Sequence, residues 1–185
     1  MTKPNHTLPQ RKIIHLQDFD YAQNGAYFIT MVTHKRVCLF GTVNHDKMVL
    51  NDAGKMLETV LLEIPGFIPG LEIDLFQIMP NHVHAIITIG PFIESGQPNV
   101  AQLNIPNPTG NANPSSLFDI VRRFKTLTTR RYIVGVRDYG WPRFDKHLWQ
   151  RSFYEHVIRN EREYEAIVYY IYANPMNWEK DKEYR

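Results

Sequence analysis

The stretch LEIDLFQIMPNHVHAIITI, residues 71–89, decides the fold. Two runs rich in apolar and β-branched residues, 71–79 and 82–89, flank the turn signal Pro80-Asn81. This pattern predicts a tight antiparallel hairpin. Residues two apart in a strand project from the same face. The face expected to join the core carries Val83, Ala85, Ile87 and Ile89.

His82 and His84 therefore share the other face of the second strand. Two imidazoles about 7 Å apart along a strand can converge on one divalent ion, and imidazole suits Mn²⁺, Zn²⁺ or Fe²⁺. A pair of surface or hydrogen-bonded histidines would give the same sequence pattern. His-x-His by itself leaves both interpretations open.

Outward from the hairpin, the chain alternates strand and helix signals. Strands are expected at 26–33 and 148–151, with a hairpin return within 41–50. Helices are expected at 53–64, capped by Asn51 or Asp52, at 117–133, capped by Ser115 or Ser116, and from about 155 to 173, ended by Pro175. These elements predict an α+β fold, with helices packed on one face of an antiparallel sheet.

The composition is that of an ordinary globular domain. The chain has 185 residues, is 43% hydrophobic and contains one cysteine, Cys38, which excludes an internal disulfide framework. We see neither a secretory signal nor an apolar run of roughly 20 residues. We therefore expect a cytoplasmic protein without a membrane segment. Residues 91–114, rich in Pro, Asn and Gly, are expected to form a flexible surface insertion.

Positive charge is concentrated between residues 121 and 160. This window holds ten basic and three acidic side chains, a net +7, whereas the rest of the chain is −5. Clustered Arg and Lys bind phosphates by displacing condensed counterions, so the asymmetry favours a polyanionic partner. A solvated basic helix face is the alternative. The window begins with Arg122, Arg123, Lys125, Arg130 and Arg131.

The last helix carries a second set of candidates. Tyr170 lies on one shoulder of its apolar stripe, and Asn174 follows one turn later. A phenol oxygen can attack a phosphorus centre, and an amide oxygen can bind a hard cation. Tyr169 should face outward and Tyr172 lies on the opposite shoulder, so both are weaker candidates. Aromatic packing would explain the segment YYIY equally well.

Several ordered motifs resemble one protein family. MPNHVHAIITI resembles the "histidine, hydrophobic, histidine" signature of the HUH single-strand nucleases, and in particular of their single-tyrosine transposases, including the REP-associated tyrosine transposases. Other pieces that fit in order are YFITMVT, LFG, LNDAGKM, VRRFKTLTTR, LWQRSFYEHVIRNEREY and YYIYANPMNW. The resemblance implies one ferredoxin-like catalytic domain over 21–178, with tails at 1–20 and 179–185.

The same resemblance implies a site and a reaction. His82 and His84 would bind a divalent metal, Mg²⁺ or Mn²⁺, and Tyr170 would be the nucleophile. Asn174 would complete the metal site, although related insertion-sequence enzymes usually have glutamine there. The protein would cleave and rejoin single-stranded DNA near hairpins through a 5′-phosphotyrosine intermediate. The residues that would contact the DNA backbone are Arg122, Arg123, Lys125, Arg130 and Arg131.

Other features of the family leave choices open. Trp149, Phe153 and Tyr154 could stack on unpaired bases. Family members differ in whether one chain or two build the active site, so a homodimer is allowed. Two alternative functions remain: a catalytically silent DNA- or RNA-hairpin-binding protein derived from a transposase, and a zinc metallohydrolase.

Overall fold

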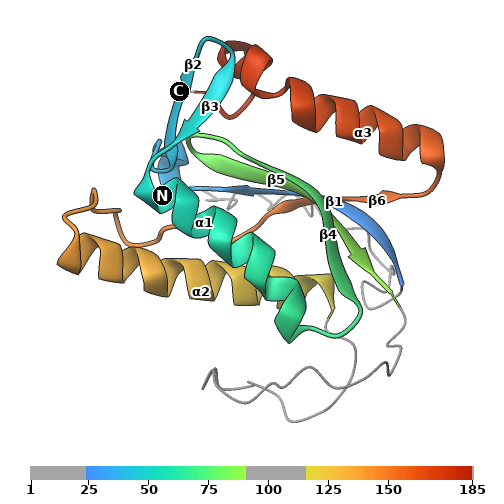
Figure 1. Ribbon diagram of the computed structural model, residues 1–185, viewed down its shortest axis with the longest axis horizontal. Helices are drawn as coiled ribbons and strands as arrows, with labels where there is room; N and C mark the ends of the chain where they lie inside the picture. The colour runs from blue at the N-terminus through green and yellow to red at the C-terminus, as the bar shows by residue number, and fades with distance from the viewer. Residues whose placement is uncertain (1–23, 91–115, 185) are drawn as a thin grey trace, which may run out of the picture.

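The computed structural model describes residues 24–90 and 116–184. The N-terminal tail expected at 1–20 and the insertion expected at 91–114 therefore lie outside the described residues. The elements form three layers, with α3 above a central sheet and with α1 and α2 below it (Figure 1).

The central sheet has four antiparallel strands in the order β4-β5-β1-β6. These strands are β1 (Gly25–Val32), β4 (Leu71–Ile78), β5 (His82–Ile89) and β6 (Tyr154–Ile158). The predicted β4–β5 hairpin is confirmed, and the Met79 N–H donates to the His82 carbonyl, 2.8 Å away, across its turn. The sheet thus places the His-x-His segment on a central strand.

A second, two-stranded hairpin joins β2 (Gly41–Asn44) to β3 (Lys47–Leu50). Its turn residues His45 and Asp46 have φ of 49° and 60°. Two consecutive positive φ values match the twist of a two-residue hairpin turn. The hairpin expected within 41–50 is therefore confirmed.

The side chains of β5 alternate strictly between the two faces of the sheet. The side chains of Val83, Ala85, Ile87 and Ile89 join the main core with α1 (Asp52–Glu63) and α2 (Leu117–Asp138). Ile86 lies on the other face, with His82 and His84, and packs with Phe28 and with Ile171 of α3 (Glu161–Ala173).

The predicted α+β class with an antiparallel sheet is confirmed, but the helices do not all share one face. Helices α1 and α2 lie together as expected, whereas α3 covers the face that carries the histidines (Figure 1). The apolar stripe of α3 needs an apolar surface to cover, and Phe28 and Ile86 supply one on that face. This placement brings the end of α3 over the His pair.

The start of the last helix was predicted wrongly. Residues 154–158, assigned largely to that helix, form β6 and pair with β1, and α3 begins only at Glu161. The Asn160 side chain caps α3 by accepting from the Glu163 N–H at 2.9 Å, and the Glu163 carboxylate accepts from the Arg159 N–H at 3.0 Å. These two side chains together cap the helix start. The strand expected at 148–151 is reduced to one bridge between Trp149 and Thr33.

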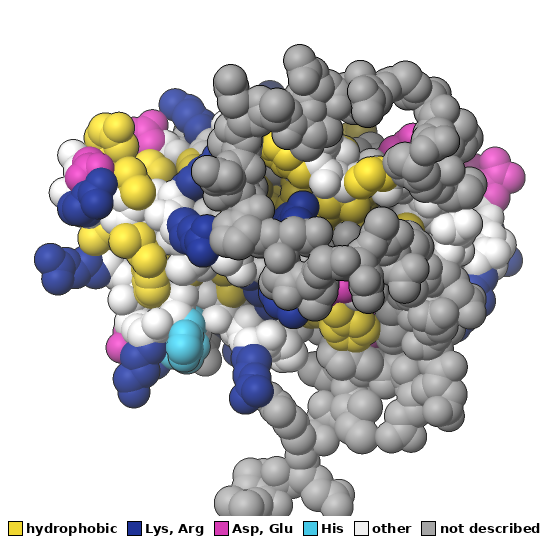
Figure 2. Space-filling model, turned by 90° about the horizontal axis from the view of Figure 1, so that it is seen from below, with side chains coloured by type: hydrophobic (Ala, Val, Ile, Leu, Met, Phe, Trp, Pro, Cys, Tyr) yellow, Lys and Arg dark blue, Asp and Glu magenta, His cyan; other side chains and the backbone are white. Residues whose placement is uncertain are grey.

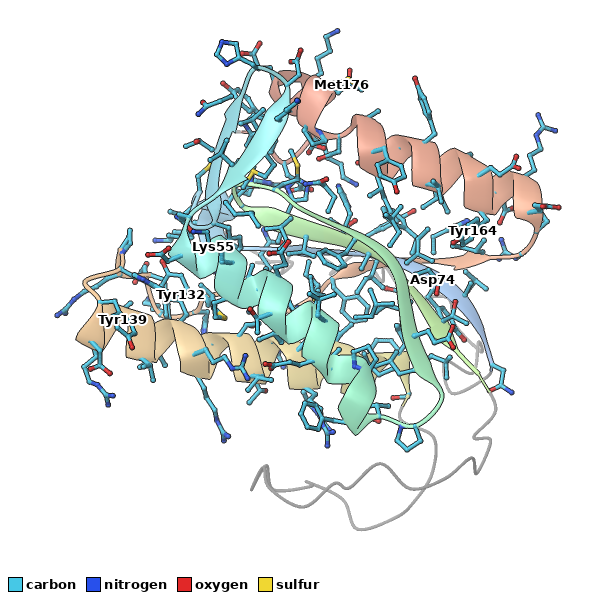
Figure 3. All side chains as sticks on the ribbon, viewed as in Figure 1. Lys55, Asp74, Tyr132, Tyr139, Tyr164 and Met176 are labelled. Atoms are coloured by element: carbon cyan, nitrogen blue, oxygen red, sulfur yellow. The ribbon has the colours of Figure 1, made fainter. Side chains whose placement is uncertain are left out.

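Side chains fill the space between α3 and the sheet (Figure 3). Tyr164 on α3 lies near Asp74 of β4, and burial together with the Asp74 charge raises the pKa of Tyr164. Three short 3-10 turns complete the described residues: η1 (His34–Arg36), η2 (Ile64–Phe67) and η3 (Pro175–Lys180). Among the helices of residues 24–90 and 116–184, none is long and apolar enough to cross a membrane.

Candidate active site

His82 and His84 lie side by side beneath the end of α3, and both are fully buried. Their Nε2 atoms are 3.0 Å apart and their ring centroids 4.5 Å apart. Two ligand atoms at right angles, each roughly 2.1 Å from one ion, lie about 3.0 Å apart. The two imidazoles therefore converge, with a spacing that suits neighbouring positions on one metal and equally a hydrogen bond between the two rings.

Asn81 fixes which nitrogen of His82 carries the proton. Its Nδ2 donates to the carbonyls of Arg36, at 3.1 Å, and Glu183, at 2.8 Å, so its Oδ1 must be the atom that faces His82 Nδ1 at 2.9 Å. An amide oxygen only accepts, so His82 Nδ1 donates and its Nε2 keeps a free lone pair. His84 Nδ1 is 2.9 Å from the Thr30 hydroxyl, which can accept or donate and so supports either neutral tautomer.

Burial keeps both imidazoles neutral. It lowers the pKa of His82 to about 4, although the negative charges of Asp181 and Glu183 partly oppose the shift. Burial, followed by the neighbouring His82, holds the pKa of His84 well below its usual value. Neutral imidazole is the form that binds metal ions. At physiological pH the pair is therefore ready to act as ligands without losing a proton.

Tyr170 reaches this pair from α3. Its Oη lies 3.4 Å from His84 Nε2, and its ring packs edge-on against Phe28. The side chain is 40% exposed, so a substrate can reach it, whereas Tyr169 and Tyr172 are 75% and 64% exposed. Burial, followed by the charges of Asp181 and Glu183, raises the pKa of Tyr170 to about 12. The phenol is therefore protonated at neutral pH in the protein alone.

Asn174 sits at the end of α3 and is buried close to His82, whose pKa its side chain raises. Its Nδ2 donates to Asp181 Oδ2 at 2.9 Å. Its Oδ1 is buried and has no hydrogen-bond partner among the described residues. An orphaned carbonyl oxygen costs free energy unless a donor or cation meets it.

Asp181 is a member of the site that sequence reasoning missed. His82, His84 and Asp181 each offer one ligand atom, and these atoms lie within 4.8 Å of one another. Residues 179–185 carry no periodicity or motif that would relate them to His82, and they were expected to be a tail. Two imidazole nitrogens, a carboxylate and an orphaned amide oxygen all present lone pairs to one another, which is a donor set that fits a divalent cation.

The five predicted basic residues lie on α2, on the other side of the sheet from the His pair. Figure 2 looks onto this side and shows Lys and Arg side chains distributed among apolar ones. Arg122, Lys125 and Arg130 line a groove of about 610 Å³ that also contains Lys146 and Arg151. The remaining two turn toward the α1 region: Arg131 pairs with Glu63 at 2.7 Å, and Arg123 reaches the Phe67 carbonyl.

Of the aromatic side chains expected to stack on bases, two are core residues. Trp149 and Phe153 are buried, and Trp149 donates its indole N–H to the Thr128 hydroxyl at 2.9 Å. Tyr154 is 41% exposed and lies on the same face as Phe28 and His84. Of the three, Tyr154 is the one that is exposed beside the site.

Comparison with known proteins relates this arrangement to transposases. No family model matches the chain. An uncharacterized protein of Haemophilus influenzae is 36% identical over 186 residues, which cover 99% of this chain and 98% of that protein. The REP-associated tyrosine transposase of Escherichia coli is 25% identical over 156 residues, covering 84% of this chain and 69% of that protein.

A solved structure, that of the REP-associated tyrosine transposase bound to a REP hairpin, shares the fold with a TM-score of 0.55 and 21% identity. The match covers 91% of this chain and 76% of that one. The chain therefore shares its fold with a REP-associated tyrosine transposase and is similar in sequence to that of Escherichia coli.

Proposed function

We propose that this protein is a metal-dependent transposase that cleaves and rejoins single-stranded DNA near hairpins, with Tyr170 as the nucleophile. The observation that carries this proposal is the position of the Tyr170 phenol, 3.4 Å from one of two buried, neutral imidazoles whose Nε2 atoms are 3.0 Å apart. A nucleophile beside a metal-competent pair is what phosphoryl transfer to a side chain requires.

The ligands proposed are His82, His84 and Asn174, the last through its orphaned Oδ1. A bound Mg²⁺ or Mn²⁺ would polarise the scissile phosphate and stabilise the negative charge that develops on the phenol oxygen. Asn81 and Thr30 hold the two imidazoles in orientation through their Nδ1 atoms. The helix α3, anchored by Ile171 on Phe28 and Ile86, holds Tyr170 in place.

The proposed chemistry conserves the energy of the phosphodiester bond. The Tyr170 oxygen attacks the phosphorus and gives up its proton as the O–P bond forms. The bond from phosphorus to the 3′ oxygen breaks, and that oxygen leaves as a 3′-hydroxyl after taking up a proton. The product is a 5′-phosphotyrosine, which the 3′-hydroxyl of a second strand can attack to reverse the step without ATP.

Hairpin DNA is the proposed substrate because the chain shares its fold with a transposase solved bound to a REP hairpin. The basic groove on the α2 side can bind backbone phosphates through Arg122 and Arg130, whereas the Lys125 ammonium donates to the carbonyls of Gln150 and Ser152. The edge strand β6 separates this groove from Tyr170. We therefore propose that the bound strand passes around β6, where Tyr154 can stack on a base.

Two histidines with one carboxylate are also a donor set found in catalytic zinc sites that activate water. The two functions make opposite predictions for Tyr170→Phe. A tyrosine transposase loses all cleavage, whereas a zinc hydrolase keeps it and forms no covalent product.

The test is denaturing electrophoresis of the protein incubated with labelled single-stranded hairpin DNA and Mn²⁺. Wild type should give a covalent protein–DNA band, and Tyr170→Phe should give none. Tyr172→Phe is the matched control, since it removes one hydroxyl from an exposed tyrosine on the same helix and should keep the band. A band that persists in Tyr170→Phe would reject Tyr170 as the nucleophile.

A further inference from the structure

The last described residues, 178–184, return to the His pair, with Trp178 and Glu183 buried. The Trp178 ring lies 5.8 Å from that of His82, and Tyr184 packs edge-on against Trp178. Lys182 lies over the ring of Tyr154, 5.0 Å from its centroid. We refer to residues 178–184 as the C-terminal segment.

Buried polar contacts hold the C-terminal segment in one position. Glu183 is only 7% exposed, and its carboxylate accepts from Arg36 Nε at 2.5 Å. The Glu183 carbonyl accepts from Nδ2 of Asn81, the same side chain whose Oδ1 fixes the tautomer of His82. One buried amide therefore ties the segment directly to a proposed metal ligand.

These contacts leave the Asp181 carboxylate facing the His pair in a fixed orientation. Its Oδ1 accepts from the Glu183 N–H at 2.6 Å, and its Oδ2 accepts from Asn174 Nδ2 at 2.9 Å. Each carboxylate oxygen has a second lone pair, so both remain able to bind a cation. One Asp181 oxygen and one nitrogen from each of His82 and His84 lie within 4.8 Å of one another.

We propose that Asp181, delivered by the C-terminal segment, is a protein ligand of the divalent metal. This inference rests on the proposed metal-dependent function and extends it. A carboxylate adds the negative charge that two neutral imidazoles and a neutral amide lack, and it shifts the donor set toward the hard cations Mg²⁺ and Mn²⁺. Asn174 then has two tasks, since its Nδ2 orients Asp181 while its Oδ1 faces the site.

The test is calorimetric titration of the full-length protein with Mn²⁺, in the absence of DNA. Wild type should bind one ion per chain. Asp181→Asn keeps the size of the side chain but removes its charge, and should weaken binding by roughly 10- to 100-fold or more. Glu179→Gln is the matched control, because it removes one negative charge from an exposed residue of the same segment. It should leave the affinity unchanged within about twofold of wild type.

A second variant separates ligation from a structural role. Asp181→Cys replaces a hard oxygen with a soft thiolate, so it should raise the preference for Zn²⁺ over Mn²⁺. A residue that only supports the fold would not change which metal is preferred. An unchanged metal preference in Asp181→Cys would overturn the inference.

The outcomes also separate this inference from the proposed function. If His82→Ala loses Mn²⁺ binding while Asp181→Asn binds as wild type does, Asp181 is not a ligand and the proposed function stands. If wild type binds no Mn²⁺ at all, the metal-dependent function itself fails. If Asp181→Asn and Glu179→Gln weaken Mn²⁺ binding equally, Asp181 acts only through its negative charge and not as a ligand, and the inference is overturned.

Discussion

Asn81→Ala should disturb both stability and metal binding, because one buried side chain serves three partners. The change deletes the hydrogen bonds to His82 Nδ1 and to the carbonyls of Arg36 and Glu183. Each buried hydrogen bond contributes about 1 kcal/mol, so the free energy of unfolding should fall by about 3 kcal/mol. In a chain of this length that corresponds to a melting temperature lower by about 6–12 °C.

The same substitution removes the acceptor that fixes the tautomer of His82. Loss of such a partner lowers metal affinity by roughly 10- to 100-fold. Thermal unfolding followed by circular dichroism and Mn²⁺ titration of the native protein measure the two effects separately. Asn177→Ala is the control, since it removes one hydrogen bond, to the Ala173 carbonyl, at an exposed residue. If Asn81→Ala has the same melting temperature as Asn177→Ala and binds Mn²⁺ with the affinity of wild type, Asn81 does not organise the site.

Three further predictions address cleavage, DNA binding and stability. His82→Ala should abolish DNA cleavage yet retain hairpin affinity in an electrophoretic mobility shift assay, because the groove on α2 lies on the other face of the sheet; equal loss of both activities would contradict this separation. The logarithm of hairpin affinity should fall linearly with the logarithm of salt concentration, with a smaller slope in Arg130→Ala; equal slopes would remove Arg130 from the DNA contacts. Burial lowers the pKa of Lys125 to about 8, below its value of about 10.4 in unfolded chains, so the unfolded state binds more protons between these values. As the pH rises through this range, the free energy of unfolding measured by urea denaturation should increase for wild type by up to about 1.4 kcal/mol per pH unit more than for Lys125→Met; an equal pH dependence of the two proteins would contradict the lowered pKa.

Local sequence patterns were enough to predict the elements that position the histidines. The period of two in β5 assigned Val83 and its alternate neighbours to the core, and the structure confirms this face. The side-chain oxygens of Asn51 and Ser116 accept backbone N–H groups at the helix starts expected from the sequence. These features depend on contacts between near neighbours in the chain, so periodicity and capping residues reveal them.

The errors lie where distant segments decide the structure. Residues 154–158 became a strand because they pair with β1, more than a hundred residues earlier in the chain. The apolar stripe of α3 was visible in the sequence, but the face of the sheet that it covers depended on Phe28 and Ile86. Propensity alone carries no information on either pairing.

In the candidate site, too, local patterns predicted some residues while long-range contacts decided others. The shoulder position of Tyr170 followed from helix geometry, and the structure brings its phenol to His84. Asp181 depends on a chain reversal after α3 and on the tertiary contacts of Glu183 with Arg36 and Asn81. Those contacts join residues 102 or more positions apart in the sequence, and no local motif announces them.

The most direct test of the proposed mechanism is the polarity of the covalent product. Hairpin DNA labelled at its 3′ end, and the same strand labelled at its 5′ end, are each incubated with the protein and Mn²⁺, and the labelled peptide is identified by mass spectrometry. We predict that only the 3′ label stays with the protein, on Tyr170, while the 5′ label leaves on a fragment that ends in a 3′-hydroxyl. Retention of the 5′ label, or attachment to a residue other than Tyr170, would contradict the mechanism.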